Sequence, residues 1–121
     1  MKIKTANLTG SSLDWAVATA TYLPPPTIKG TLMNGKVRVR KTGKFIGIPR
    51  DWGWFSPSTD WSQGGPIIEN EHTTVWFDGN EWHASNDDFA DVCGPTPLIA
   101  VMRCYVASKL GDEVDVPEEL I

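Results

Sequence analysis

Apolar residues recur at helical spacing near the start of the chain. The stripe consists of Leu13, Ala16, Val17 and Ala20. This pattern predicts a short first helix over residues 13–20. Asp14 falls in the expected first turn, where the helix dipole favours a carboxylate, so we interpret it as a helix-stabilising residue. Trp15 lies off the stripe, which leaves it either at a rim or in the core.

A second and clearer helical pattern lies near the end of the chain. Its apolar stripe consists of Leu98, Val101, Met102, Tyr105, Val106 and Leu110. Thr96 is a favourable N-cap, Pro97 suits the first helical position, and Gly111 is a typical stop signal. These signals predict an amphipathic helix from Pro97 to Leu110, long enough to cover one face of a small sheet.

Between the helices, alternating patterns predict two β-hairpins. The first joins residues 31–33 to residues 36–40 through Asn34-Gly35, a pair that suits a type I′ turn. The second joins residues 73–77 to residues 81–84 through a turn at 78–80. Residues 45–48 and 67–68 are expected to add short strands. The predicted fold is therefore α+β, a small antiparallel sheet of two hairpins packed against an N-terminal and a C-terminal helix.

Length and composition predict one domain over residues 1–121, because a chain of 121 residues fills a single core. A net charge of −4 argues against long nucleic acid as a partner, since that binding depends on many cation–phosphate contacts. One basic patch stands out, which we interpret as the solvated face of the first hairpin. It comprises Lys36, Arg38, Arg40, Lys41 and Lys44.

No apolar window approaches the length that crosses a bilayer, and the first residues lack the apolar core of a signal peptide, so no membrane partner is expected. Cys93 and Cys104 have no second pair and no histidine at zinc-finger spacing. Two free thiols in a reducing cytosol explain them best.

Chemistry concentrates in residues 51–66, which hold three of the six tryptophans, one phenylalanine and two carboxylates between Gly and Pro. Flat apolar faces beside many hydrogen-bonding groups are typical of small-ligand pockets. An aromatic turn that fills a small core would have the same composition. Both interpretations stay open from the local sequence.

Catalytic and metal-binding signals are weak. His72 and His83 have no Ser, Cys or Glu partner at a spacing that indicates a triad or a metal site. The acidic residues 85–91 lack the ligand spacing and glycine of an EF-hand loop. We therefore predict no catalytic residue, no metal and no cofactor.

Several segments resemble a known family. They are residues 8–10 and 13–18, the run Ser-Pro-Ser-Thr-Asp-Trp-Ser-Gln-Gly-Gly-Pro at 56–66 with its neighbours Phe55, Ile67 and Ile68, Gly-Pro-Thr-Pro at 94–97 with Arg103, and residues 109–112 and 116–120. Together they resemble the NinX-like family of small phage and prophage proteins. The resemblance implies a protein made in the host bacterial cytoplasm, and it transfers no catalytic residue.

The motif residues fall on the aromatic segment and on the start of the last helix, which suggests a common site. A helix N-terminus suits phosphate, and aromatic rings suit a base. By analogy with other phage accessory proteins, we expect a non-enzymatic homo-oligomer that sequesters a nucleotide-type signal of host immunity, cyclic or derived from ADP-ribose. The expected stacking residues are Trp54, Phe55 and Trp61. Ser56, Thr59, Asp60 and Gln63 are expected to read the ribose and base edges, and Thr96 and Arg103 to hold phosphate.

Two other functions compete with this hypothesis. In an adaptor or inhibitor of a host enzyme, the same aromatic residues would anchor a protein partner. In an enzyme acting on a nucleotide, Asp60 or His83 would serve as base, but no nucleophile–base pair or metal set accompanies them. For Arg103, an ion pair with an acidic side chain is the alternative to a phosphate contact.

Overall fold

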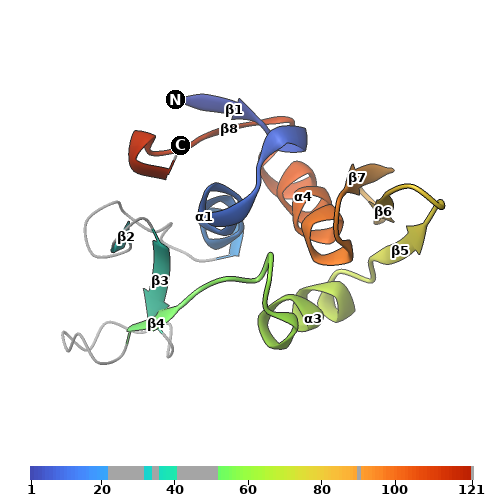
Figure 1. Ribbon diagram of the computed structural model, residues 1–121, viewed down its shortest axis with the longest axis horizontal. Helices are drawn as coiled ribbons and strands as arrows, with labels where there is room; N and C mark the ends of the chain where they lie inside the picture. Colours follow the sequence, from blue (N-terminus) through green and yellow to red (C-terminus); the bar gives the residue numbers. More distant parts are fainter. Residues whose placement is uncertain (22–31, 34–35, 41–51, 90, 121) are drawn as a thin grey trace.

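The computed structural model describes residues 1–21, 32–33, 36–40, 52–89 and 91–120. Within these ranges the chain forms three α-helices and three small antiparallel sheets. Figure 1 shows α4 in the centre, with α1 on one side and the β5–β6–β7 sheet on the other. The α+β class is confirmed, with helices towards both ends and antiparallel hairpins between them. The two predicted hairpins lie in separate sheets.

Helix α4, Pro97–Leu110, matches the prediction closely. The Thr96 hydroxyl oxygen accepts a hydrogen bond from Ile99 N at 3.1 Å, which satisfies one donor at the start of the helix. Gly111 follows the last residue with φ of 93°, a conformation that glycine adopts without strain. Local capping chemistry therefore sets both ends.

Helix α1, Gly10–Thr21, is longer than the predicted 13–20. Trp15 is buried against Ala18 and Val37, so its place is the core. The interpretation of Asp14 was wrong, because Asp14 lies in the second turn and points into the protein, where it contacts Ser58. The helix begins earlier than its apolar stripe does, since Gly10 takes φ of 56° and turns the chain into the helix.

The two hairpins form as expected. Strands β2, Leu32–Met33, and β3, Lys36–Arg40, pair with Met33 opposite Lys36, and the intervening turn lies outside the described residues. Strands β5, Thr74–Phe77, and β6, Trp82–Ser85, pair with Phe77 opposite Trp82. The strand predicted over residues 45–48 also lies outside the described residues.

Further strands complete the sheets. β3 also pairs with β4, Trp52–Trp54, at the beginning of the aromatic segment. β6 pairs with β7, Val92–Gly94. At the ends of the chain, β1, Lys2–Lys4, pairs with β8, Glu113–Asp115. Short 3-10 helices occur at Thr5–Asn7 and Glu118–Leu120.

The strand expected at residues 67–68 was wrong, because these residues belong to helix α3, Trp61–Asn70. This helix contains Gly64, Gly65 and Pro66, which disfavour helix formation. A Cβ atom built on Gly64 would lie 2.6 Å from Leu98 Cδ2 and 2.6 Å from the Pro57 carbonyl oxygen. Glycine at this position therefore lets α3 pack closely against the start of α4 and the preceding turn.

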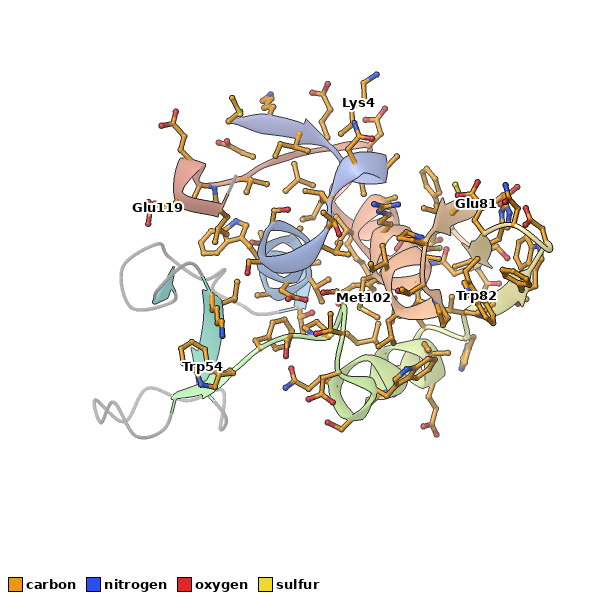
Figure 2. The ribbon with its side chains drawn as sticks, in the orientation of Figure 1. Lys4, Trp54, Glu81, Trp82, Met102 and Glu119 are labelled. Carbon is orange, nitrogen blue, oxygen red and sulfur yellow. The ribbon has the colours of Figure 1, made fainter. Side chains whose placement is uncertain are left out.

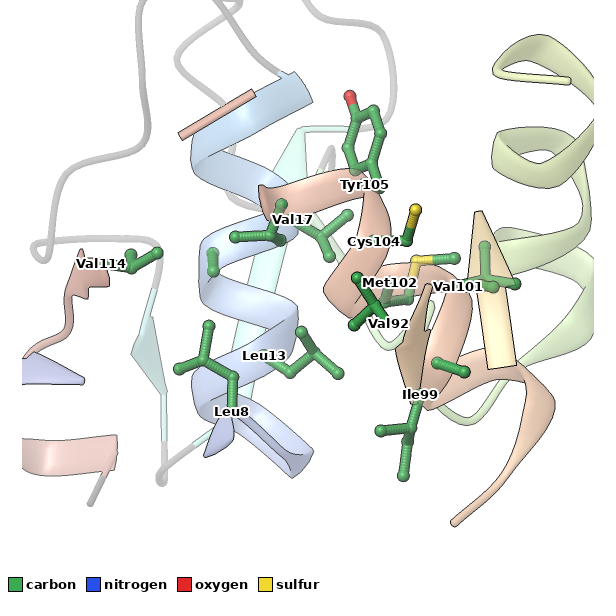
Figure 3. Packing of buried hydrophobic residues seen from close by; sticks show 14 of the residues in the cluster. Leu8, Leu13, Val17, Val92, Ile99, Val101, Met102, Cys104, Tyr105 and Val114 are labelled. Carbon is green, nitrogen blue, oxygen red and sulfur yellow. The ribbon is translucent and has the colours of Figure 1, made fainter. Parts of the chain in front are cut away.

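The main core lies where α1 and α4 meet, and the β5–β6–β7 sheet covers the other side of α4 (Figure 3). Its largest fully buried side chains include Leu8, Leu13, Val17, Val101, Met102 and Val106. Burial of this apolar surface is the dominant favourable contribution to folding. Among the described residues, no helix has the length and apolar character needed to span a membrane.

Candidate functional site

The turn between β4 and α3 is held by the side chain of Gln63. Its Oε1 accepts a hydrogen bond from Ser56 N at 2.9 Å, and its Nε2 donates to Trp54 O at 3.1 Å and to Asp60 Oδ2 at 3.2 Å. Asp60 caps α3, since its Oδ1 accepts from Ser62 N and from the Ser62 hydroxyl. These bonds lower the pKa of Asp60. Asp60 and Gln63, both predicted to read a ligand, thus use these polar atoms to shape the turn.

Beside this turn lies a hollow of about 390 Å³, which we call the Trp54 cavity. It is lined by Gly10, Ser11 and Asp14 of α1, Lys36 and Val37 of β3, and Trp54, Phe55, Ser56 and Thr59. Its volume is within the range of small-molecule pockets. The structure therefore brings four of the predicted residues, those from the 54–59 segment, to one cavity.

Trp54 forms an aromatic wall of this cavity. Its side chain is 54% exposed, and Figure 2 shows it on the β3–β4 ladder, away from the α1–α4 core. The Lys36 ammonium group lies 6.0 Å from the centre of the ring. An aromatic face beside a cation suits a ligand with a ring and a negative charge. Of the two interpretations left open for the aromatic segment, filling of the core does not apply to Trp54.

Asp14 lines the Trp54 cavity and is only 5% exposed. Its Oδ1 accepts a hydrogen bond from Ser58 N at 3.0 Å. Burial raises the pKa of Asp14 to about 6, although the main chain and hydroxyl of Ser58 oppose the change. The Ser58 hydroxyl itself is buried and makes no hydrogen bond with the described residues. A buried acid with a shifted pKa in a cavity is a functional-site candidate.

Sequence reasoning missed Asp14 for a physical reason. Its burial depends on the 55–59 segment, which is more than 40 positions away in the chain. Nothing in the local pattern of α1 reveals that contact. The one available signal was that Asp14 stands directly beside the apolar stripe.

A second hollow of about 220 Å³, the Trp61 cavity, lies on the other side of Thr59. It is lined by Ser58, Thr59, Trp61 and residues 96–99 at the start of α4. Trp61 is 56% exposed, so it too is a surface residue and not part of the core. The structure thus confirms that the aromatic segment and the Thr96 end of α4 lie together. The Thr96 hydroxyl, however, already accepts the capping hydrogen bond from Ile99.

Arg103 lines neither cavity. Its Nε donates to Leu8 O at 2.8 Å and its Nη1 to Cys93 O at 3.0 Å. Partial burial lowers its pKa. The guanidinium group therefore links α4 to the main chain at Leu8 and at Cys93, and it satisfies the carbonyl groups of both residues. Arg103 makes no ion pair with a described acidic side chain, and the expected phosphate contact stays a prediction.

His83 has partners that the sequence reasoning did not consider. Its Nδ1 contacts Asp91 Oδ1, its Nε2 lies 2.6 Å from Asp78 Oδ2, and its ring stacks on Trp76. The carboxylates of Asp78 and Asp91 raise the pKa of His83, and hydrogen bonds lower the pKa of Asp78 to about 2. With both ring nitrogens engaged by carboxylates, the imidazole links the strand ends.

Comparison with protein families identifies the chain. The model described as "Bacteriophage P22, NinX" matches residues 4–109, which is most of the sequence. The chain belongs to this NinX family. No curated protein matched. The resemblance noted from the motifs is confirmed, and the matched region includes both cavities. The protein is therefore a phage protein, and the family description by itself names no ligand or reaction.

Proposed function

We propose that this phage protein binds and sequesters a small nucleotide-type signal of host immunity, cyclic or derived from ADP-ribose, without catalysis. The observation that carries the proposal is the Trp54 cavity, where a half-exposed indole ring stands beside the Lys36 ammonium group. A base can stack on Trp54 while Lys36 attracts a phosphate group. Ser56 and Thr59 line the same cavity, and in this proposal their hydroxyl groups contact the ribose.

The second cavity supports a ligand with two ring systems. Thr59 lines both hollows, so a molecule bound in the Trp54 cavity can extend past it towards Trp61 and the start of α4. Cyclic dinucleotides and ADP-ribose derivatives have two such halves. In this proposal Asp60 and Gln63 hold the turn that separates the two hollows.

Ligand-induced stabilisation tests the proposal. A panel of cyclic dinucleotides, cyclic ADP-ribose derivatives and linear nucleotides is added while thermal unfolding is followed. At a concentration one hundred times Kd, a specific ligand stabilises the folded state by about 2.7 kcal/mol. No shift in melting temperature with any compound at millimolar concentration overturns the proposal.

Tryptophan variants then locate the site. Trp54→Ala and Trp61→Ala are expected to weaken binding by roughly 1–3 kcal/mol, as the loss of base stacking does. Because both rings are more than half exposed, folding stability should change little. Trp76→Ala is the matched control, since Trp76 is an exposed tryptophan on β5, outside both cavities. Equal binding by all four proteins places the site elsewhere.

Three further properties belong to the proposal. The protein acts in the host bacterial cytoplasm, it assembles as a homo-oligomer, and it returns the ligand chemically unchanged. Native mass spectrometry of protein from infected cells measures both oligomer mass and retained small molecules. Recovery of a modified ligand after long incubation would point to an enzyme instead.

A protein–protein adaptor or host-enzyme inhibitor is the alternative function. The exposure of Trp54, Trp61 and Phe77 favours it, because exposed aromatic residues are frequent anchors of protein interfaces. Affinity purification from host lysate separates the two functions. An adaptor retains one host protein in stoichiometric amount, whereas a sequestering protein releases a small molecule on denaturation.

A further inference from the structure

Asp14 is a buried acid whose second carboxylate oxygen is available. Ser58 N donates to Oδ1, and among the described residues no hydrogen bond reaches Oδ2. An ionised carboxylate only accepts hydrogen bonds, and its burial without enough donors is unfavourable. The side chain lines the Trp54 cavity, so a molecule in that cavity can supply the missing donor.

The titratable groups near Asp14 come from the elements that pack around α1. α1 packs against β3 and α4, and the 55–59 turn closes over it. The described titratable side chains on or next to these elements are Lys36, Asp60, Arg103, Cys104, Tyr105 and Lys109. Of these, Lys36 is the one that lines the Trp54 cavity. The cavity is therefore lined by a buried acceptor, an aromatic ring and a cation.

We propose that Asp14 accepts a hydrogen bond from an amino or ring N–H group of the bound nucleobase, while Lys36 holds the anionic group of the same ligand. This inference rests on the proposed function and specifies its ligand: an anionic nucleotide whose base edge carries an N–H donor. Trp54 then stacks against the face of that base. The buried acid thus selects the base edge, and the lysine selects the charge.

Proton linkage follows from this arrangement. A donor from the ligand stabilises the ionised form of Asp14 and lowers its pKa from about 6. Binding near pH 6 therefore releases part of a proton, and affinity rises between pH 5 and pH 7. A ligand that places an acceptor or a phosphate against Asp14 has the opposite effect and takes up a proton.

Calorimetric titration at pH 6, in two buffers of different ionisation enthalpy, measures the sign of this linkage. The probes are adenosine, guanosine and cytidine 5′-monophosphates, with purine riboside 5′-monophosphate as the analogue whose base has no N–H donor. We expect proton release with at least one of the first three. The purine riboside compound is expected to bind more weakly and to release less of a proton, because only its phosphate, with a second pKa near 6, then contributes.

Asp14→Asn tests the residue itself. The amide oxygen still accepts from Ser58 N, so the fold is expected to survive. The amide nitrogen that replaces Oδ2 is a donor and cannot accept a hydrogen bond from the base. At pH 7.5 affinity for the monophosphates should fall roughly tenfold. At pH 6 the proton release should fall to the level of the purine riboside compound, which comes from the phosphate alone. Asp87→Asn, an exposed aspartate outside the cavity, is the matched control and should leave both quantities unchanged.

Lys36→Gln tests the contact between Lys36 and the anionic group of the ligand. Affinity for the monophosphates should fall roughly tenfold, whereas affinity for the uncharged nucleosides should not change. Lys2→Gln, on the exposed β1 strand, is the control.

The possible outcomes distinguish failure of this inference from failure of the proposed function. Nucleotide binding with proton uptake, or with the same affinity and linkage in Asp14→Asn, overturns the role of Asp14 and leaves the proposed function standing. Equal loss of nucleoside and nucleotide affinity in Lys36→Gln overturns the role of Lys36. Absence of binding by every nucleotide tested overturns both the inference and the proposed function.

Discussion

Helices α3 and α4 are held in place by different forces. α4 buries nine of its 14 residues, whereas α3 buries only Gly64 among its 10. Apolar surface removed from water stabilises α4. α3 is held by the Asp60 cap, by the hydrogen bonds of Gln63 and by the close approach of Gly64 to its neighbours. Its Ile67 and Ile68 pack against the core but are only partly buried. This protein therefore combines a central helix that is buried along most of its length, α4, with a helix that has few buried contacts, α3.

The candidate site lies beside α3, the less buried of the two helices. Both cavities are bordered by the turn that leads into α3, and their tryptophans are exposed. Segments with few buried apolar contacts open locally at lower free energy than the core does. α4 provides the fixed surface on which this turn rests. Substitutions in the two helices should therefore differ in both size and mechanism.

The largest effect is expected for Met102→Asp, because Met102 is fully buried in α4. An unpaired carboxylate at this position should destabilise the fold by about 5 kcal/mol or prevent folding. Leu110→Asp, at the exposed end of the same helix, should cost far less. Urea unfolding monitored by circular dichroism measures both, and similar losses would contradict burial as the force that holds α4.

Asp14→Asn is expected to stabilise the protein at neutral pH. The folded-state pKa of about 6 lies above the ordinary value of 3.8, so ionisation opposes folding as pH rises through this window. About two pKa units correspond to roughly 3 kcal/mol above pH 6 and to none below pH 4. Urea unfolding at pH 7.5 and at pH 4 checks the difference between variant and wild type. A variant no more stable than wild type at pH 7.5 would show that Asp14 is not a strained buried acid.

Adjacent glycines of α3 should respond with opposite signs. Gly64→Ala places a methyl group against Leu98 and the Pro57 carbonyl, and overpacking of this kind costs about 2 kcal/mol. A Cβ on Gly65 meets nothing within 4 Å, so Gly65→Ala should stabilise the helix by roughly 0.5–1 kcal/mol. Melting temperatures of the pair decide the matter. Two gains of equal size would mean that helix propensity and not close packing governs α3.

The smallest effect is expected for Gln63→Ala. It removes the hydrogen bonds to Ser56 N and Trp54 O, with an expected loss of about 1 kcal/mol. Hydrogen exchange gives the sharper measurement, because the Ser56 amide should lose protection while amides in the middle of α4 keep theirs. Glu69→Ala, an exposed position on α3, serves as control. Unchanged protection of Ser56 would show that Gln63 does not hold the turn.

Much of the fold was predictable because its signals are local. The stripe from Leu98 to Val106, the Thr96 cap and Gly111 all act within one helix, and they gave α4 its bounds. The hairpins were predictable for the same reason, since turn chemistry and alternation are short-range patterns. The aromatic segment was also recognised as unusual from composition alone. Its division into two cavities around Thr59 was not predictable.

The amino-acid sequence by itself determined α4, the hairpins, the family and the residues of the aromatic segment. Tertiary structure decided three other matters: α3 forms despite Gly-Gly-Pro, Arg103 serves the main chain, and Asp14 is buried beneath Ser58. Each of these depends on an atom brought close by folding, such as the Pro57 carbonyl above Gly64. Local patterns cannot encode such contacts, because the free energy that favours them arises only when distant segments exclude water from one another.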